Sequence, residues 1–206
     1  MKHLKYILIV IIFPAVFINF NCDDCTDCKT HKNFSAEDLQ IIYNGDANTT
    51  MSIMNYFVHD DSLVLRKTSS DIRDFDDSIL GLLIDRMYAT VRDPNHSGVG
   101  IAAPQIGINK RIIWVQRYDK SGFPFEVYLN AYITDLSDTI VAKNDGCLSI
   151  PGVSQASMRA IWVEVEYDKT DGTHHKEKII HQFTAHIFQH EIDHLNGIVF
   201  LDRPVI

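Results

Sequence analysis

The part of this sequence best suited to chemistry is a histidine pair near the C-terminus. His190 and His194 lie four residues apart in a stretch whose pattern predicts a helix, so both imidazoles project from one face and can bind one divalent metal ion. Glu191 lies between them and can accept a proton from a water molecule at that metal. The spacing indicates a metallohydrolase. The alternative is a surface pair of histidines, which the glutamate and a cysteine upstream disfavour.

Cys147 is the third candidate ligand, and it lies in the sequence Gly-Cys-Leu-Ser. A thiolate is a strong ligand for zinc or ferrous iron. With His190 and His194 it provides three protein ligands and leaves a fourth position for water, whereas a structural site normally closes all four positions. A cysteine considered alone is more often a buried core thiol, but the flanking Gly146 and Leu148 favour the metal role.

A glycine-rich segment supplies further candidates. Residues 98–105 read Gly-Val-Gly-Ile-Ala-Ala-Pro-Gln. Its two glycines allow the backbone to approach a substrate closely, and Gln105 offers an amide donor that can polarise a carbonyl group. A dinucleotide-binding loop is the other reading, but the segment lacks the third glycine and the strand-to-helix setting of such a loop.

The three segments together resemble the motifs of the peptide deformylase family. Gly-Val-Gly-Ile-Ala-Ala-Pro-Gln, Gly-Cys-Leu-Ser and Gln-His-Glu-Ile-Asp-His-Leu-Asn-Gly occur in the family's order and with similar separations. Residues 62–66, Ser-Leu-Val-Leu-Arg, also resemble the family's N-terminal Leu-Arg element. The resemblance covers about residues 50–206, and the three motifs together are highly specific.

The resemblance implies a metal site and a base. Its metal ligands would be Cys147, His190 and His194, and its general base would be Glu191. Ferrous iron is the implied metal, although zinc, nickel or cobalt could occupy the site. The implied reaction is hydrolysis of the N-formyl group of formylmethionyl peptides with release of formate.

The resemblance also implies groups that hold the substrate. Gln105 and the backbone N–H of Leu148 would stabilise the oxyanion. The backbone of Gly98, Val99 and Gly100 would pair with the substrate peptide in the manner of an added β-strand. Pocket side chains for the methionine are only suggested by the pattern, and the candidates are Ile101, Leu148 and Ile187.

One position departs from the family. The family usually has glutamate where this chain has Asp145, and we interpret that glutamate as the partner of an arginine, here Arg159. Aspartate keeps the charge but is shorter by one methylene, so we expect the pair to persist through a small backbone shift or a water molecule. A displaced Cys147 loop would affect the rate more than the set of ligands.

Two other residues of the C-terminal helix are assigned supporting positions. His186 lies one turn before His190 and is spaced like a ligand, but the helical period favours a solvated face for it. We expect Asp193 to support the helix or the ligands rather than to bind the metal.

The pattern along the chain predicts an α+β fold, with mainly antiparallel β-sheets packed around a central C-terminal metal-binding helix and a second helix nearer the N-terminus. Helical periodicity predicts helices over residues 74–91, with Asp74 or Asp76 as N-cap, and 183–195. Alternation and β-branched content predict strands over residues 111–117, 125–129, 161–167 and 176–180.

The N-terminus predicts a targeting segment. Lys2 and Lys5 precede an apolar run over residues 6–20, which is short for a transmembrane helix and suits a signal sequence. Cys22 follows and resembles a lipidated lipoprotein cysteine, so residues 1–22 are read as a lipoprotein-like signal. A plain signal or uncleaved anchor is the next alternative, and a cytoplasmic protein is the least favoured. These features predict an exported or membrane-anchored protein of the cell envelope.

Residues 23–49 are polar and are expected to form a tether, with a short helix beginning at Ser35, and the catalytic domain is expected over residues 50–206. Within the tether region, Cys22, Cys25 and Cys28 could form a cluster or zinc site. No fourth cysteine is near them, so incidental thiols in a solvated tether are favoured.

The composition limits the function classes. The chain has 206 residues, 46% hydrophobic and 22% charged, which suits one folded domain. Its formal net charge of −8 argues against nucleic-acid binding, and we expect a monomer. Two competing functions remain at this stage: a metallopeptidase that cuts ordinary peptide bonds, and a non-catalytic, surface-anchored binding protein.

Overall fold

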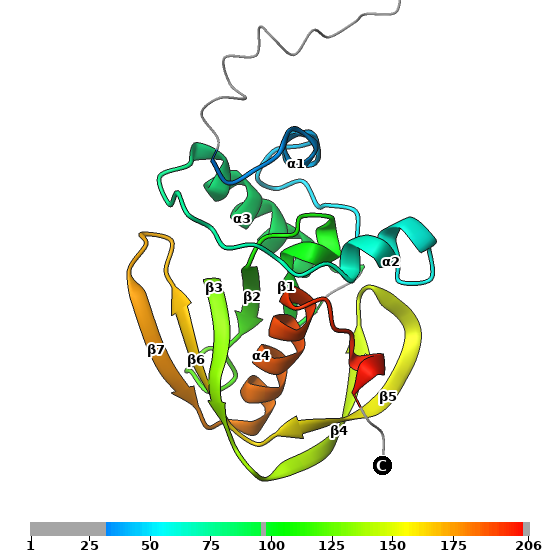
Figure 1. Cartoon of the computed structure of the whole chain (residues 1–206), viewed down its shortest axis with the longest axis vertical. Coiled ribbons are helices and arrows are strands. Elements are labelled where there is room, and N and C mark those ends of the chain that lie inside the picture. The colour runs from blue at the N-terminus through cyan, green and yellow to red at the C-terminus, as the bar shows by residue number, and fades with distance from the viewer. Residues whose placement is uncertain (1–31, 96–97, 204–206) are drawn as a thin grey trace, which may run out of the picture. The chain divides into compact units, whose positions relative to one another are not determined.

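The computed structural model describes residues 32–95 and 98–203 (Figure 1). The helices are α1 (Ala36–Ile42), α2 (His59–Leu65), α3 (Ser78–Val91), the 3-10 helix η3 (Ala103–Ile106), α4 (Gln182–Leu195) and the 3-10 helix η4 (Phe200–Asp202). The strands are β1 (Gly100–Ala102), β2 (Ile112–Gln116), β3 (Phe125–Leu136), β4 (Ile140–Cys147), β5 (Ile150–Ala160), β6 (Val163–Asp168) and β7 (His174–Ile179). The expected signal segment over residues 1–22 and the cysteines Cys22, Cys25 and Cys28 lie outside the described residues.

The strands form two antiparallel sheets. One has five strands in the order β1-β2-β3-β6-β7, and the other is the hairpin β4-β5. Side chains alternate across the larger sheet, as the pleat requires. Ile112 and Leu129 enter a core cluster with α1 and α3, whereas Ile113 and Tyr128 enter a cluster with α4. Helices therefore cover both faces of this sheet.

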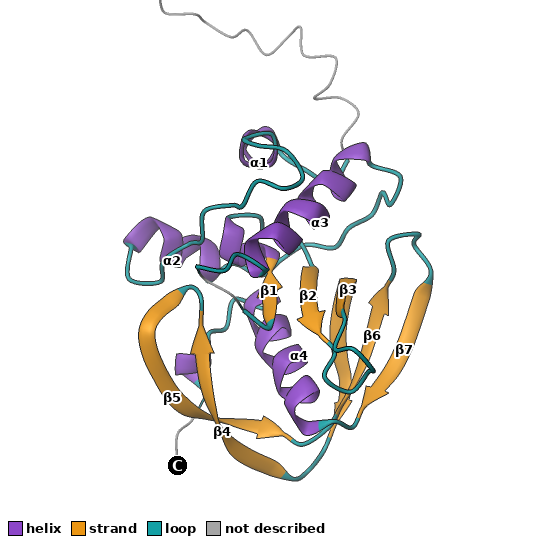
Figure 2. Cartoon of the chain, turned by 180° about the vertical axis from the view of Figure 1, so that it is seen from behind, coloured by secondary structure: helices purple, strands orange, loops and turns teal. Residues whose placement is uncertain are grey.

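Helix α4 occupies the centre of the molecule. It contacts β1 and β2 of the larger sheet and β5 of the hairpin, and it lies between the two sheets in Figure 2. Nearly all of its residues are buried, so its polar residues face other protein groups rather than water. The expected α+β fold with antiparallel sheets and a C-terminal helix is confirmed.

The predicted helices and strands are present, with shifts of a few residues at their ends, except that β3 continues to Leu136, well beyond its predicted end at residue 129. The cap predicted for α3 was wrong: Asp77, rather than Asp74 or Asp76, is the N-cap, and its Oδ1 accepts a hydrogen bond of 3.1 Å from the backbone N–H of Ile79. The β4-β5 hairpin was not predicted. Five of the eight residues of β4 are exposed and only Asp145 is buried. Its apolar residues come first and its polar residues follow, so its sequence lacks the alternation that marks a half-buried strand.

The folded unit begins before the expected boundary at residue 50. Phe34, Leu39 and Ile42 are buried in the cluster that contains α3, and α1 lies against α3 (Figure 1). The guanidinium of Arg86, itself 2% exposed, donates hydrogen bonds to the backbone carbonyls of Ile41 and Ile42 at 2.9 and 2.7 Å. Within the described residues, the polar stretch therefore packs on the domain from Asn33 onward and is not a tether there.

The short helix expected at Ser35 is present as α1. The Ser35 side chain accepts from the backbone N–H of Asp38, and the Asp38 carboxylate accepts from the backbone N–H of Ser35, which forms a capping box.

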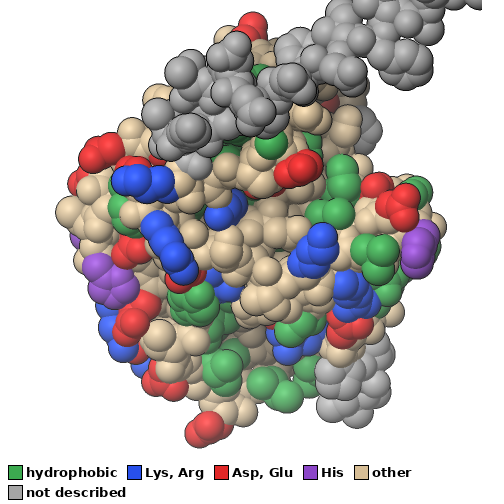
Figure 3. Space-filling view, turned by 45° about the horizontal axis from the view of Figure 1, so that its top comes forward, with side chains coloured by type: hydrophobic (Ala, Val, Ile, Leu, Met, Phe, Trp, Pro, Cys, Tyr) green, Lys and Arg blue, Asp and Glu red, His purple; other side chains and the backbone are tan. Residues whose placement is uncertain are grey.

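Acidic and basic side chains are interspersed on the face of the molecule that Figure 3 shows, with apolar side chains between them. Among residues 32–95 and 98–203, no helix combines the length and the apolar character needed to cross a bilayer.

Candidate active site

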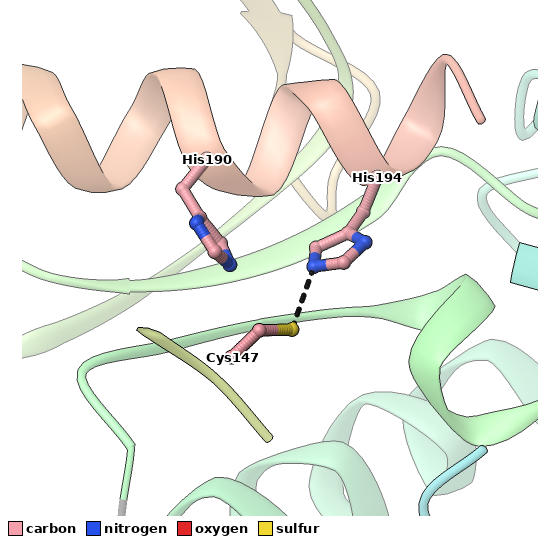
Figure 4. Close-up of side chains that lie close together, drawn as sticks. All are labelled: Cys147, His190 and His194. Atoms are coloured by element: carbon pink, nitrogen blue, oxygen red, sulfur yellow. Dashed lines mark hydrogen bonds between the residues drawn. The ribbon is translucent and has the colours of Figure 1, made fainter. Parts of the chain in front are cut away.

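Three side chains that could bind a metal converge between α4 and the end of β4 (Figure 4). His190 and His194 project from one face of α4, and Cys147 is the last residue of β4. Ligand atoms of the three residues all lie within 4.8 Å of one another. The Nε2 atom of His194 lies 3.2 Å from the Sγ atom of Cys147. The structure thus brings together the ligand set that the sequence suggested.

The buried carboxylate of Asp145 orients one of these ligands. Its Oδ1 lies 2.8 Å from Nδ1 of His190, which leaves Nε2 of that ring free for a metal. Its Oδ2 accepts hydrogen bonds of 2.8 Å from both Arg159 and Ser157. Although burial disfavours the charged form, hydrogen bonds from His186, His190 and Arg159 hold the pKa of Asp145 well below its usual range. The aspartate therefore pairs with Arg159 directly, without the water bridge that we had allowed for.

Asp193 supports the site from the opposite side of Arg159. The Arg159 guanidinium, which is 2% exposed, also donates to Asp193. Asp193 accepts in addition from Nε of Arg203, at 2.8 Å. This chain of ion pairs fixes β5, α4 and the segment after η4 to one another. The side chain of Asp193 thus contacts arginines rather than the candidate ligands.

The protonation of the candidate ligands suits a metal cation. Burial opposes ionisation of the Cys147 thiol, but the charge of His194 and hydrogen bonds from both histidines lower its pKa to about 5. A thiolate is the form that binds metals. Oε2 of Glu191 is among the buried atoms without a hydrogen-bond partner. A thiolate, an imidazole whose Nε2 faces it and an unpartnered carboxylate oxygen together fit a divalent metal.

Glu191 lies beside these ligands in a position suited to proton transfer. Its side chain is buried, and burial raises its pKa to about 7, against the lowering effect of His190 and His194. A carboxyl group with a pKa near the working pH is an efficient proton acceptor and donor. A Cβ built on Gly100 would lie 2.4 Å from Oε1 of Glu191, so only glycine allows β1 to approach this carboxylate so closely.

Gln105 has a fixed orientation at the same site. Its Oε1 accepts a hydrogen bond of 2.8 Å from the backbone N–H of Ala102. Its Nε2 therefore points away from that contact, and it lies 3.3 Å from Sγ of Cys147 and 3.4 Å from Oγ of Ser149. The amide donor is thus directed at Cys147, one of the candidate metal ligands.

A cavity of about 400 Å³ opens onto these groups. Its lining includes all of the predicted catalytic and substrate-binding residues: Gly98, Val99, Gly100, Gln105, Leu148 and Glu191. Two of the three candidate metal ligands, Cys147 and His190, also line it. His194 lies behind them, 1% exposed. Of the three pocket candidates, Leu148 and Ile187 line the cavity, whereas Ile101 was wrong. It belongs to the core cluster on the other face of the sheet, because alternation along β1 directs its side chain there.

The expectation for His186 was also wrong. Its side chain is not solvated: the residue is 6% exposed and lines the cavity, and its Nε2 lies 3.4 Å from Oδ2 of Asp145. The helical period places His186 on the same face of α4 as His190. It could not show that the β4-β5 hairpin covers that face. Phe183, which also lines the cavity, had not been singled out. Both residues precede His190 at helical spacing on α4, and this spacing was the signal in the sequence that could have placed them beside the site.

Comparisons with known proteins agree on one family. A family model described as "Polypeptide deformylase" matches residues 54–205. The peptide deformylase of Synechocystis sp. is 38% identical over 144 residues, which cover 68% of this chain and 73% of that protein. The peptide deformylase of Thermotoga petrophila is 36% identical over 140 residues, which cover 68% of this chain and 80% of that protein.

Solved structures show the same similarity. The Met-Ala-Ser-bound class I type b peptide deformylase from Acinetobacter baumannii is 33% identical, with a TM-score of 0.68, and the match covers 76% of this chain and 99% of that chain. The peptide deformylase from Thermotoga maritima is 30% identical, with a TM-score of 0.67, and the match covers 76% of this chain and 99% of that chain.

Proposed function

The chain belongs to the peptide deformylase family, and we propose how its own residues perform the reaction of that family. It is a metal-dependent hydrolase that removes the N-formyl group from formylmethionyl peptides. Membership decides between the functions left open by the sequence, in favour of deformylation over cleavage of ordinary peptide bonds or a purely binding role. The assignments of individual residues below are proposals.

Cys147, His190 and His194 would hold the metal, and we propose ferrous iron as the native ion. Thiolate and imidazole ligands are compatible with ferrous iron. The same ligands also bind zinc, nickel or cobalt. Zinc is the alternative ion, because a ferrous site outside the cytoplasm, where we place the protein below, is exposed to oxidation. A bound divalent ion supplies Lewis acidity, which makes a water molecule more acidic and polarises a carbonyl oxygen.

The side chains around the metal then move the protons. Glu191 accepts a proton from the water that attacks the formyl carbon, and its raised pKa supports this role. The amide of Gln105 and the backbone N–H of Leu148 donate hydrogen bonds to the oxyanion that develops. Glu191 then delivers the proton to the departing amine, and the C–N bond breaks to give formate and a free N-terminus.

The substrate peptide pairs with β1. This strand is at the end of the five-stranded sheet order, and Gly98, Val99 and Gly100 line the cavity. The carbonyl of Val99 already accepts a hydrogen bond of 2.8 Å from the backbone of Gln116 in β2, so an added peptide would lie along the opposite edge. Strand addition supplies main-chain hydrogen bonds that are indifferent to side-chain sequence.

The observation that carries the proposal is the convergence of Cys147, His190 and His194 beside Glu191 on one cavity. Its test is anaerobic purification with metal analysis and assay of formate release from formyl-Met-Ala-Ser. We expect Glu191→Gln to lower kcat by roughly 10²–10⁴-fold while metal content is retained. The exposed Glu37→Gln on α1 is the matched control. A metal-loaded Glu191→Gln enzyme with undiminished activity would refute the proposed base.

We further propose that residues 1–22 direct the protein to the cell envelope and that Cys22 is lipidated. The basic, apolar and cysteine segments support this proposal. An exported enzyme would act, as a monomer, on formylated peptides outside the inner membrane. Fractionation after labelling with a fatty acid tests the anchor, with Cys22→Ala as the control. An unlabelled protein found in the cytosol would refute the proposed lipid anchor and export. Analytical ultracentrifugation would test whether the protein is a monomer.

A further inference from the structure

Three aromatic side chains, Tyr118, Phe123 and Phe183, form a cluster beside the cavity, and the proposed reaction gives none of them a role. The ring centroid of Tyr118 lies 4.9 Å from that of Phe183 and 5.3 Å from that of Phe123. Phe123 and Phe183 are 51% and 43% exposed, and Tyr118 is half-buried. Apolar side chains that gather at a protein surface often mark a binding site.

This aromatic cluster is continuous with the catalytic cavity. Phe183 lines that cavity, and Tyr118 lines a second cavity of about 340 Å³. Gly98 and Val99 line both cavities. The cluster therefore borders the backbone segment with which, as proposed above, the substrate peptide pairs.

The surroundings of β1 determine the direction in which the substrate extends. A Cβ on Gly100 would lie 2.4 Å from Oε1 of Glu191, so the formyl group, which reacts beside Glu191, lies near Gly100. Ala102 and Gln105 are buried and hydrogen-bonded to each other, which closes the site at the C-terminal end of β1. The rest of the peptide therefore extends the other way, past Val99.

The spacing of an extended peptide relates its residues to the cluster. Side chains of a strand alternate between its two sides, and each residue adds about 3.3 Å, so the first and third side chains face the same way about 7 Å apart. The first side chain enters the cavity, where Phe183 forms part of the wall. The third side chain then lies at the level of Tyr118 and Phe123, and the second points away from the cluster.

Hydrogen bonds hold the cluster in place. The hydroxyl of Tyr118 donates to Oε1 of Gln116 at 2.9 Å, and Nε2 of Gln116 donates to the backbone carbonyl of Phe123 at 3.3 Å. Phe123 has a φ of +49°, which is uncommon for a bulky residue. Such strained residues are found preferentially at functional sites. The ring of Phe123 is thus kept at the surface by an amide that also holds Tyr118.

This inference rests on the proposed function and concerns the substrate class of the same site. We propose that the aromatic cluster is a subsite for an apolar side chain on the third residue of the formyl peptide. The enzyme therefore prefers formylmethionyl peptides with leucine or a similarly large apolar residue at the third position. The second position has no such preference at this cluster.

Variants of Phe123 test the subsite without changing the metal site or the lining of the catalytic cavity. Phe123→Asn removes an exposed ring, and asparagine tolerates the left-handed backbone at this position. Phe123→Tyr keeps the ring and is the conservative variant. Phe57→Asn is the matched control, because Phe57 is 62% exposed and is not among the residues that line either cavity.

The experiment compares formyl-Met-Ala-Leu with formyl-Met-Ala-Ser. We expect kcat/KM to be about fivefold higher for the leucine peptide in the wild type, the effect of burying part of one leucine side chain. The difference should lie in KM rather than kcat, because the third residue is remote from the bond that breaks. The preference should disappear in Phe123→Asn and persist in Phe123→Tyr and Phe57→Asn.

The second position gives an internal control. The ratio of kcat/KM for formyl-Met-Leu-Ser to that for formyl-Met-Ala-Ser should be the same in wild type and Phe123→Asn, because the second side chain points away from the cluster. A wild-type enzyme without a preference at the third position, or a preference that survives in Phe123→Asn, overturns the proposal.

Binding of the product peptides gives a readout that does not depend on catalysis. Titration calorimetry should show that Met-Ala-Leu binds about fivefold more tightly than Met-Ala-Ser to the wild type, and equally to Phe123→Asn. If no formyl peptide releases formate, the proposed function fails, while these titrations still decide the role of the cluster. A cluster that instead joins two copies of the chain would give a dimer that Phe123→Asn disrupts, with unchanged peptide ratios, and this result also overturns the proposal.

Discussion

At the scale of single residues, the carboxylate of Asp145 connects the candidate metal ligands to the rest of the protein. It contacts His190 through one oxygen, and Arg159 and Ser157 through the other. The shorter side chain thus reaches both of the partners that a ligand-orienting carboxylate needs. Its charge fixes the tautomer of His190, because a carboxylate at Nδ1 leaves Nε2 as the free donor atom.

Asp145→Asn should weaken metal binding. The amide cannot provide the full negative charge beside His190, so we expect the affinity for the metal to fall about 10–100-fold. Competition with a chelator measures this change. Ser157→Ala removes a neutral donor from the same carboxylate and should have a smaller effect. Unchanged affinity in Asp145→Asn would show that Asp145 does not orient the ligand.

Gly100→Ala should impair catalysis without emptying the metal site. The new methyl group would displace Glu191, since a Cβ there would lie 2.4 Å from Oε1. Misplacing a catalytic group by about an ångström costs on the order of 10²-fold in rate, so we expect a loss of that size in kcat. Gly81→Ala is the control, because a Cβ at Gly81 meets nothing within 4 Å. Equal activity in both variants would contradict the placement of Glu191.

At the scale of elements, the sequence predicted what a short-range pattern can encode. The i, i+4 spacing on one helix placed His190 and His194 together, because helical geometry alone determines that distance. Helix geometry says nothing of the approach of Cys147, which lies 43 residues before His190 in the chain. Thiolate chemistry made it a candidate ligand, and the family resemblance implied its place in the site. In β4, which carries Cys147, the apolar residues Ile140, Val141 and Ala142 come first and polar residues follow, so the strand has no alternating pattern that would predict it.

The same limitation explains the error at His186. Periodicity predicts which side chains share a face of α4, but it does not predict which element packs on that face. Here the partner is Asp145 of β4, which reaches His186 from a distant part of the sequence. Contacts between elements that are far apart in the sequence leave no local pattern.

Arg86 should be essential for the attachment of the N-terminal segment to the domain. Its guanidinium donates to the backbone carbonyls of residues 41, 42, 44, 49 and 50. Arg86→Met keeps the volume but leaves these acceptors without their donor, so we expect a loss of about 3 kcal/mol of unfolding free energy. Urea denaturation measures the loss, and hydrogen exchange should accelerate over residues 33–50.

The exposed Arg73 of the preceding loop provides the control. Arg73→Met should leave both the stability and the exchange rates nearly unchanged, because surface substitutions usually have small effects. If Arg86→Met behaves in the same way, residues 33–49 are attached by their apolar contacts alone.

At the scale of the whole molecule, two of the buried arginines, Arg159 and Arg117, each gather several carboxylates close to α4. Arg159 connects the metal site to the C-terminal segment. Arg117, which is 1% exposed, donates to Asp119, Glu126 and Glu177 close to the N-terminal half of α4. The ring of Phe188 of α4 lies 5.7 Å from the Arg117 guanidinium. The central helix is therefore tied by an ion pair through Asp193 near its C-terminal end, whereas the carboxylates around Arg117 belong to other elements and Arg117 meets the helix at the ring of Phe188.

Arg117 should make stability depend on pH in the acidic range. Its hydrogen bonds lower the pKa of Asp119, and the pKa of Glu126 is lowered by Lys120 and Tyr128 as well as by Arg117, although burial opposes this. A carboxylate whose pKa is lower in the folded state than in the unfolded state stabilises the fold above the unfolded value, about 4. That contribution is lost as the pH falls through the folded-state value.

Arg117→Met should therefore cost about 2 kcal/mol near pH 7, less than the loss of a fully buried ion pair because the carboxylates are partly exposed. The difference between wild type and variant should shrink below about pH 4, where protonated carboxyls no longer need the guanidinium. Urea midpoints measured at a series of pH values test this. The metal site is the same in both proteins, so its own pH dependence cancels in the difference. A difference that stayed constant from neutral to acidic pH would show that Arg117 stabilises the fold through packing on α4 rather than through its charge.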